Sequence, residues 1–149
     1  MRIRNLLTAT TTMTFIASAT VAMAAQPVLT VYTYESFASE WGPGPAIETA
    51  FEAECACDVN FVALDSSIGI LGRVQLEGAS SPADIVLGLD TNLMATARKT
   101  GLLASHGVDM TGRTALPVDF NDDVFVPFDW GYFSFVYNSE TLSDVPTSM

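Results

Sequence analysis

The chain has 149 residues, of which 17 are acidic and 6 are basic, and its formal net charge at pH 7 is −11. A surface this acidic excludes nucleic acid and anionic membranes as partners, because both repel it. One histidine and few basic residues also leave little for general acid–base or phosphoryl chemistry.

Residues 1–24 have the pattern of a cleaved secretory signal peptide. Two arginines lie among the first four residues, a short apolar stretch follows, and a small-x-small triplet ends at Ala24. Threonines interrupt the apolar stretch, so an uncleaved membrane anchor would span poorly. We expect export and a mature chain beginning at Ala25 or Gln26. Removal of the two signal arginines leaves four basic and 17 acidic residues, so the net charge of the mature chain is −13. This charge agrees with a cationic ligand and equally with simple solubility.

From residue 28 onward, β-rich segments alternate with amphipathic ones. The first β-rich segment is nearly continuous in β-formers, as in a strand that is covered on both faces. Strands are expected at 28–34, 59–64 and 85–87, the last short and buried. Helices are expected at 46–54, from a cap at Ser66 or Ser67 to about Gly78, and at 92–100.

The later part of the chain is expected to be mostly loop from 102 to 121. Two more strands are expected at 124–128 and 132–137, around a turn at 129–131. Strands that alternate with helices indicate parallel pairing with right-handed crossovers. The predicted fold class is therefore α/β, with a doubly wound, mostly parallel sheet, and about 125 mature residues suffice for one such domain.

Two aromatic residues follow the first predicted strand. Tyr34 ends the strand, and Trp41 stands in a stiff Gly/Pro loop before the first helix. Ligands bind at the carboxyl ends of strands in open α/β sheets, and aromatic faces hold flat cations with about 0.5–2 kcal/mol per contact. The two rings form half of a ligand slot or pack in the core and loop, and packing is the commoner role of such rings. Phe37, between them, is expected to pack.

Polar residues follow the second and third predicted strands. Ser66 and Ser67 lie at a strand-to-helix turn, where hydroxyls and free backbone N–H groups face a cleft, and capping the helix is compatible with contacting a ligand. Asp90 and Asn92 follow the third strand, and capping the next helix is the simpler role for either. Second-tier candidates lie in the later turn: Asp129 and Trp130.

Cys55 and Cys57 are separated by one residue, and His106 alone does not complete a zinc site with them. In an oxidising compartment they form a tight disulfide or two packed thiols. His106 is expected to lie solvated in a loop. Three acidic residues are expected to form a solvated loop rather than a calcium site: Asp119, Asp122 and Asp123. The motifs of serine hydrolases, P-loop enzymes and zinc proteases do not occur in the sequence.

Several motifs occur in the same order as in the periplasmic thiamine-binding proteins of ABC transporters, which the chain resembles after residue 26. They are residues 29–45 (Leu-Thr-Val-Tyr-Thr-Tyr-Glu-Ser-Phe-Ala-Ser-Glu-Trp-Gly-Pro-Gly-Pro), 62–64, 83–90, 99–102 and 125–137. The resemblance implies a type II-like periplasmic binding protein with two lobes. It further implies that residues 25–149 are the amino-terminal lobe, truncated, with the second lobe absent.

The resemblance also implies a function and a set of site residues. In this family, aromatic residues at the positions of Tyr34 and Trp41 line the cleft that holds the cationic thiazolium and flat pyrimidine of thiamine. The family typically has an acidic residue and a glycine where this chain has Ser66 and Ser67, so the polar contacts differ in detail, and the nearest carboxylate, Asp65, lies one position earlier. The implied ligand-binding residues are Tyr34, Trp41, Ser66 and Ser67, with no catalytic residue, metal or cofactor.

The expected partners are thiamine or a thiamine phosphate and the membrane permease of an ABC transporter, with a monomeric protein in the periplasm. Two other functions stay open from the residues. One is capture of ferric iron or another small solute by a related binding protein, which would use hard ligands such as carboxylates and tyrosines. The other is a secreted enzyme whose catalytic residues lie in a second half.

Overall fold

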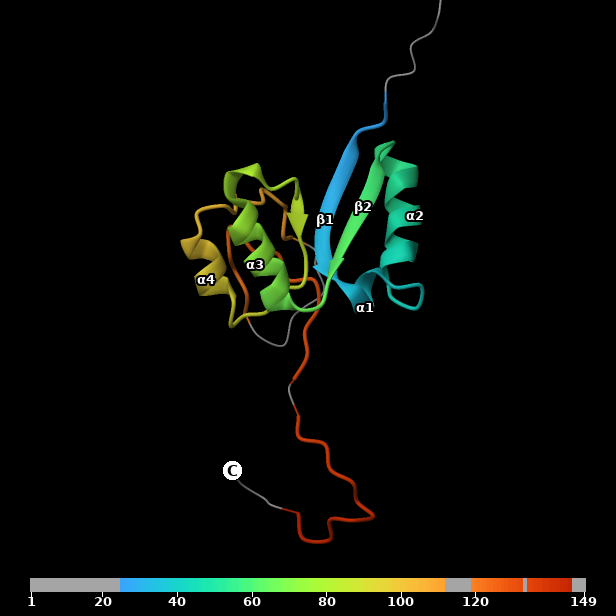
Figure 1. Ribbon diagram of the computed structural model, residues 1–149, viewed down its shortest axis with the longest axis vertical. Helices are drawn as coiled ribbons and strands as arrows, with labels where there is room; N and C mark the ends of the chain where they lie inside the picture. Colours follow the sequence, from blue (N-terminus) through green and yellow to red (C-terminus); the bar gives the residue numbers. More distant parts are fainter. Residues whose placement is uncertain (1–24, 112–118, 133, 146–149) are drawn as a thin grey trace, which may run out of the picture.

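The computed structural model describes residues 25–111, 119–132 and 134–145 (Figure 1). The predicted signal peptide at 1–24 lies outside the described residues. The elements, in chain order, are β1 (Val28–Tyr34), α1 (Glu35–Ala38), α2 (Gly44–Cys55), β2 (Asp58–Leu64), α3 (Ser67–Glu77), a 3-10 turn η1 (Gly78–Ser80), β3 (Ile85–Val86) and α4 (Met94–Lys99).

Three parallel strands form one open sheet in the order β2-β1-β3. The central strand, β1, pairs along its whole length with β2, in register from Val28 opposite Asp58, and pairs with β3 over two residues. Its three consecutive residues Val31, Tyr32 and Thr33 are all buried. Burial of successive residues requires cover on both faces, which explains the unbroken run of β-formers.

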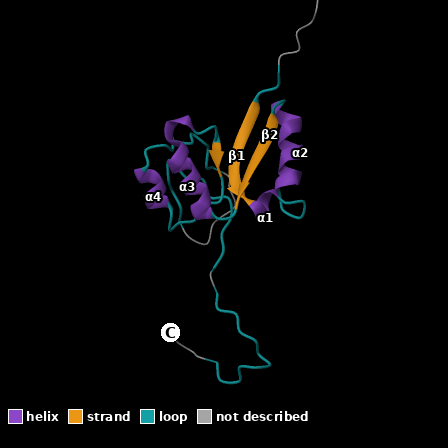
Figure 2. Ribbon diagram, in the orientation of Figure 1, coloured by secondary structure: helices purple, strands orange, loops and turns teal. Residues whose placement is uncertain are grey.

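Helices cover both faces of this sheet (Figure 2). On one face, Tyr32 packs with Ile70 and Val74 of α3. On the other, the buried ring of Phe37 in α1 meets Phe61 of β2 edge to face, with 5.6 Å between ring centroids. The chain moves from β1 to its neighbour β2 on one side and then returns past β1 to β3 on the other side. Two right-handed crossovers that run in opposite directions place their helices on opposite faces of the sheet. The doubly wound α/β class predicted from the sequence is confirmed.

A buried tyrosine ties α3 to the sheet through its hydroxyl. Tyr32 donates to a carboxylate oxygen of Glu77 at 2.9 Å, and the same carboxylate accepts from Arg73 and Ser81, each at 2.8 Å. Burial, followed by the bond to Glu77, raises the pKa of Tyr32. The bond from Arg73, followed by that from Ser81, lowers the pKa of Glu77. The only polar atom of this buried ring is thereby satisfied, as burial requires.

A short disulfide-bonded turn ends α2. Cys55 and Cys57 form a disulfide, and Ala56 between them adopts a left-handed backbone with φ of 51°. The structure therefore confirms the disulfide rather than the packed thiols. The bond lies where α2 turns into β2, at the amino end of that strand and away from the carboxyl edge of the sheet.

Two predicted elements are shorter than expected. The helix predicted from Asn92 begins at Met94, because the carboxylate of Asp90 binds the next backbone N–H groups and forms a separate turn first. The third strand has two residues, and it is not buried as expected, because Ile85 lies on the edge strand of the sheet and is exposed.

The two strands predicted at 124–128 and 132–137 do not form in the described residues. Figure 1 shows the last part of the chain extending away from the sheet as loop. Phe135 is 84% exposed there and Val136 is exposed as well. The β-rich composition predicted strands, but a strand forms only when a neighbouring strand pairs with it, and no described strand lies beside these residues. This part of the sequence-based prediction is wrong for the structure as it stands.

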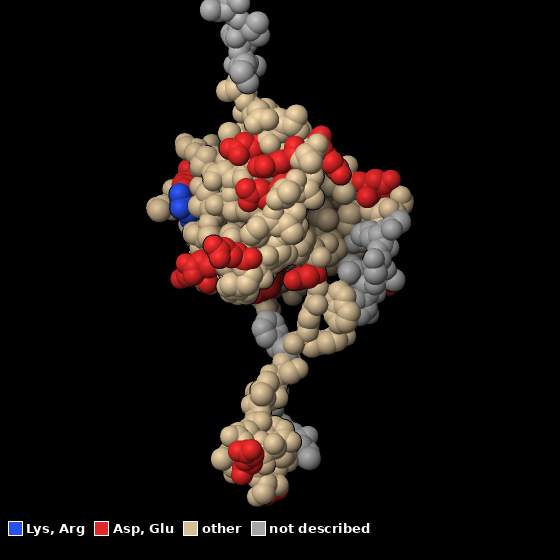
Figure 3. Space-filling view, turned by 90° about the vertical axis from the view of Figure 1, so that its right-hand side faces the viewer, with Lys and Arg blue, Asp and Glu red and all other residues tan. Residues whose placement is uncertain are grey.

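Acidic side chains are distributed over the face shown in Figure 3, whereas basic side chains occupy one small area of it. This view agrees with the excess of acidic residues in the sequence. Among the described residues, no helix is long and apolar enough to cross a bilayer.

Candidate functional site

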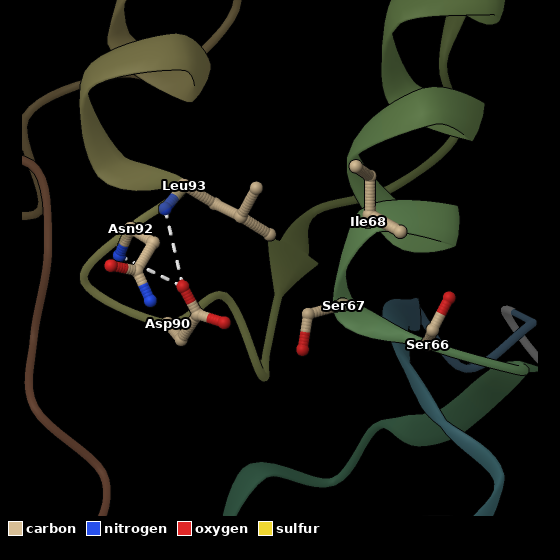
Figure 4. A pocket seen from close by; sticks show the side chains of 6 residues that line it. All are labelled: Ser66, Ser67, Ile68, Asp90, Asn92 and Leu93. Atoms are coloured by element: carbon tan, nitrogen blue, oxygen red, sulfur yellow. Dashed lines mark hydrogen bonds between the residues drawn. The ribbon is translucent and has the colours of Figure 1, made fainter. Parts of the chain in front are cut away.

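A shallow hollow of about 370 Å³ opens between the turn that joins β2 to α3 and the loop that joins β3 to α4 (Figure 4). Its walls combine polar and apolar side chains: Ser66, Ser67, Ile68, Asp90, Asn92 and Leu93. Both segments leave the carboxyl ends of parallel strands, which is the edge where open α/β sheets bind ligands. The structure thus brings together the two serines and the two β3–α4 candidates, Asp90 and Asn92.

The two serines have different roles in this hollow. The side chain of Ser66 accepts from Gly69 N at 3.2 Å and donates to Asp65 Oδ1 at 3.1 Å, so it caps α3. Ser67 is the first residue of α3, and within the described chain its hydroxyl makes no hydrogen bond. In Figure 4, the Ser67 side chain projects into the space between α3 and the loop that carries Asp90. Ser67 is therefore the serine whose hydroxyl is available to a ligand.

Asp90 holds the opposite wall of the hollow in place. Its Oδ1 accepts from the backbone N–H groups of Asn92 at 2.8 Å and Leu93 at 3.2 Å. The expected capping role is thus observed, although the capped turn precedes α4 rather than opening it. The other carboxylate oxygen of Asp90 makes no hydrogen bond within the described chain.

A second group of candidates surrounds the carboxyl end of β1. The half-buried ring of Tyr34 meets Phe37 edge to face at 6.2 Å between centroids, and Phe37 meets Phe128 at 5.5 Å. Burial, and after it the charge of Asp129, raises the pKa of Tyr34. Phe37 is 2% exposed, which confirms the packing role predicted for it. The late segment around Phe128 therefore reaches the end of β1.

Trp41 lies apart from the hollow and is 79% exposed. It belongs to a closely packed loop, because a side chain at Gly42 would collide with the backbone carbonyl oxygens of Ser36 and Phe37. Neither Trp41 nor Tyr34 lines the hollow, so the structure places the two expected aromatic residues outside the cavity that holds the two expected serines.

Three residues that shape the candidate site were not predicted from the sequence. Ile68 and Leu93 supply the apolar lining of the hollow, and nothing in their local pattern separates them from core residues. Gly88 adopts φ of 103°, and a side chain there would collide with the ring of Tyr34. A glycine directly after a strand is a signal of close approach, and this one could have been recognised.

Curated relatives match most of the chain, although no family model does. It is 53% identical over 125 residues to the thiamine-binding periplasmic protein of Brucella suis biovar 1 (strain 1330), and 52% identical over 125 residues to that of Escherichia coli (strain K12). A solved periplasmic thiamin binding protein superimposes with a TM-score of 0.74 at 52% identity over 83% of the chain.

The matched segment is similar in sequence and in fold to part of the periplasmic thiamine-binding proteins. The chain spans about 37–38% of the length of these relatives and 38% of the solved structure, while 84% of the chain itself is matched to the relatives. The α/β lobe described above is therefore a fold shared with part of a periplasmic thiamine-binding protein.

The remaining candidates lie in the loops that follow α4. Trp130 meets Tyr132 edge to face at 5.7 Å, and both rings are exposed. His106, expected to be solvated, is instead half-buried between two loop segments, with its Nε2 2.9 Å from Asp122 O. Asp122 is half-buried as well, and Arg98 binds it, so the expected solvated acidic loop is only partly observed.

Proposed function

We propose that this chain forms one wall of a thiamine-binding cleft in a periplasmic solute-binding protein that delivers thiamine to an ABC importer. The observation that carries the proposal is the 52% identity and TM-score of 0.74 to a solved periplasmic thiamin binding protein. The names of the curated relatives favour thiamine over ferric iron and over an enzymatic role. The protein is proposed to bind and release its ligand unchanged.

The aromatic candidates suit the charge and shape of thiamine, which has a cationic thiazolium and a flat pyrimidine. The ring of Tyr34 at the end of β1 is half-buried near the charge of Asp129, and the ring of Trp41 is exposed. Cation–π contacts of this kind contribute about 0.5–2 kcal/mol each, more as water is excluded. We assign these two residues to the ligand rings.

The polar candidates suit the hydrogen-bonding groups of the same ligand. Ser67 offers a hydroxyl without a partner in the described chain, while Ser66 keeps the turn in shape by capping α3. We assign Ser67 to direct contact and Ser66 to contact through the turn that it fixes.

The complete protein is proposed to close a second lobe over this wall by a hinge motion. Burial of the ligand between two lobes would exclude the water that weakens its contacts with one wall alone. We further propose export through a signal peptide at residues 1–24, a monomeric state, docking to a membrane permease, and acceptance of thiamine phosphates through second-lobe residues.

Titration calorimetry of the complete protein with thiamine tests this function. The expected result is one bound thiamine per protein without turnover, and Trp41→Ala is expected to weaken binding by about three- to thirtyfold. The chain of residues 25–149 alone is expected to bind no tighter than about micromolar, because one wall leaves the cation wet. Submicromolar binding by that chain, or an unaffected Trp41→Ala variant, would place the ligand elsewhere.

A further inference from the structure

The segment from residue 119 to 128 has no helix or strand in its described residues, yet it reaches the candidate site. The ring of Phe128, in this segment, packs on Phe37, which in turn contacts Tyr34. A loop without ladder hydrogen bonds keeps such a position only if side chains fix its backbone, since each free backbone residue costs about 1–2 kcal/mol to order. The contacts that fix this segment are therefore candidates for control of the site.

Asp122 first folds the segment on itself. Its Oδ1 accepts from the backbone N–H groups of Val124 at 2.8 Å and Phe125 at 2.9 Å, a side-chain turn typical of aspartate. These two bonds are the leading cause of the lowered pKa of Asp122. The carboxylate therefore stays ionised, and its other oxygen is free to bind a cation.

That cation is Arg98, in the last turn of α4. Its guanidinium donates to Asp122 Oδ2 at 2.6 Å and to Asp123 Oδ1 at 3.1 Å, and it lies over the ring of Phe125 at 5.5 Å from the centroid. One planar side chain thus contacts three residues of the segment at once, which a lysine ammonium does not reproduce.

A second set of bonds holds the same segment from residues 105–106. Asp123 O accepts from His106 N and from the Ser105 hydroxyl, each at 3.0 Å, while His106 Nε2 lies 2.9 Å from Asp122 O. The Nδ1 atom of His106 accepts from Val108 N at 2.8 Å. Because Nδ1 is an acceptor here, the proton of the neutral ring is on Nε2, which donates to the carbonyl.

We propose that these residues form a clasp, defined as Arg98, Ser105, His106, Asp122 and Asp123, and that Arg98 is a positioning residue for the ligand wall. The clasp fixes residues 122–125, and the chain then has only two residues before Phe128 packs against Phe37. It thereby sets where Phe128 and Asp129 lie relative to Tyr34. This inference rests on the proposed function for its effect on thiamine, but its effect on the segment is independent of any ligand.

Amide hydrogen exchange on the chain tests the first half of the inference. Arg98→Gln removes the charge from an exposed side chain, so the lobe is expected to stay folded. Exchange at residues 122–128 is expected to accelerate by about two- to thirtyfold, the range of two partly exposed ion pairs. Lys99→Gln is the matched control, because it removes the same charge one residue away from a side chain with no ion pair in the described chain. Equal exchange in the two variants would overturn the clasp.

Thiamine calorimetry on the complete protein tests the second half by a double-mutant cycle. Arg98→Gln is expected to weaken thiamine binding by about two- to fivefold, and Arg98→Lys is expected to restore only part of the loss. In a Phe128→Ala background, Arg98→Gln is expected to have a smaller effect than in the wild type, because the ring through which the clasp acts on Phe37 is gone. A merely structural arginine would give additive losses, and additivity would overturn the positioning role.

If the wild-type complete protein binds no thiamine, the proposed function and the positioning role both fail, while the exchange result still decides whether the clasp holds the segment.

Discussion

Two regions of the chain are held together by different means. From β1 to α4, strands pair in register and helices bury apolar side chains on both faces of the sheet. From residue 119 onward, the described chain has no strand or helix, and ion pairs, side-chain turns and single ring contacts fix residues 122–128 to the lobe. The first region owes its stability to burial, whereas the second owes its position to polar bonds that solvent and pH can modify. The proposed site draws residues from both.

The largest expected effect is on the burial that holds the first region. Ile70 is fully buried against Tyr32 and Val74, so Ile70→Ala is expected to lower the free energy of unfolding by about 2–5 kcal/mol. Chemical denaturation of the 25–149 chain measures this loss.

Ile68→Ala is the matched control, because Ile68 lies on the same helix but is 67% exposed. Its cost is expected to stay within about 0.5 kcal/mol. Similar losses in the two variants would mean that α3 does not bury the face that the contacts indicate.

The next effect is at the junction of the two regions, where Tyr34 passes over Gly88. Gly88→Ala is expected to cost about 1–3 kcal/mol, because φ of 103° is strained for any other residue and the new methyl group would collide with the Tyr34 ring. Thiamine binding by the complete protein is expected to weaken as well, since the ring must move.

Gly72→Ala is the control for Gly88→Ala. It lies inside α3, and apart from the neighbouring backbone of the helix itself nothing lies within 4 Å of the added methyl group. The change is expected to stabilise the helix by about 0.5–1 kcal/mol. Opposite signs for the two alanines would confirm that the positive φ of Gly88 and its contact with Tyr34, rather than the loss of a glycine as such, cause the effect.

The same division explains what could be predicted from the sequence. Val28–Tyr34 was predicted with its observed bounds, because an unbroken run of β-formers is a local property of the sequence. Ser66 was one of the two predicted caps, and it caps α3 as a short side chain before an amphipathic helix should. The predicted doubly wound order followed from alternation alone.

The second region could not be predicted in this way. Arg98 contacts Asp122, which lies 24 positions later in the chain. Sequence patterns report only on residues that are close together in the sequence, so they do not reveal this contact. Residues 124–128 have β-rich composition, but pairing depends on a partner strand that composition does not reveal. The placement of the site residues stays a prediction, because the hollow contains Ser66 and Ser67 but neither aromatic residue.

A smaller effect separates the two serines of the hollow. Ser66→Ala removes the cap of α3 and is expected to cost about 1 kcal/mol in thermal or chemical unfolding. Ser67→Ala is expected to leave stability within about 0.5 kcal/mol and instead to weaken thiamine binding by the complete protein, by up to about tenfold. If Ser67→Ala unfolds the lobe and Ser66→Ala does not, the two roles are exchanged.

The smallest expected effect is a pH dependence in the second region. Bonds from Phe125 N and Val124 N, and to a lesser degree from Arg98, lower the pKa of Asp122 below its ordinary 3.8. A carboxyl whose pKa falls on folding stabilises the folded chain fully above its unfolded pKa, and this contribution is lost as the pH falls through the folded value.

Asp122→Asn keeps an oxygen for the two backbone bonds but loses the charge. The wild type is therefore expected to melt higher than Asp122→Asn at pH 7, and the gap between their melting temperatures is expected to close as the pH falls below 3.8 and through the lowered pKa of the folded chain. Arg98→Gln removes only a lesser cause, so it is expected to retain most of this pH dependence. A gap that persists at low pH would mean that the Asp122 charge does not stabilise the segment, and hydrogen bonds alone would then have to hold residues 122–125.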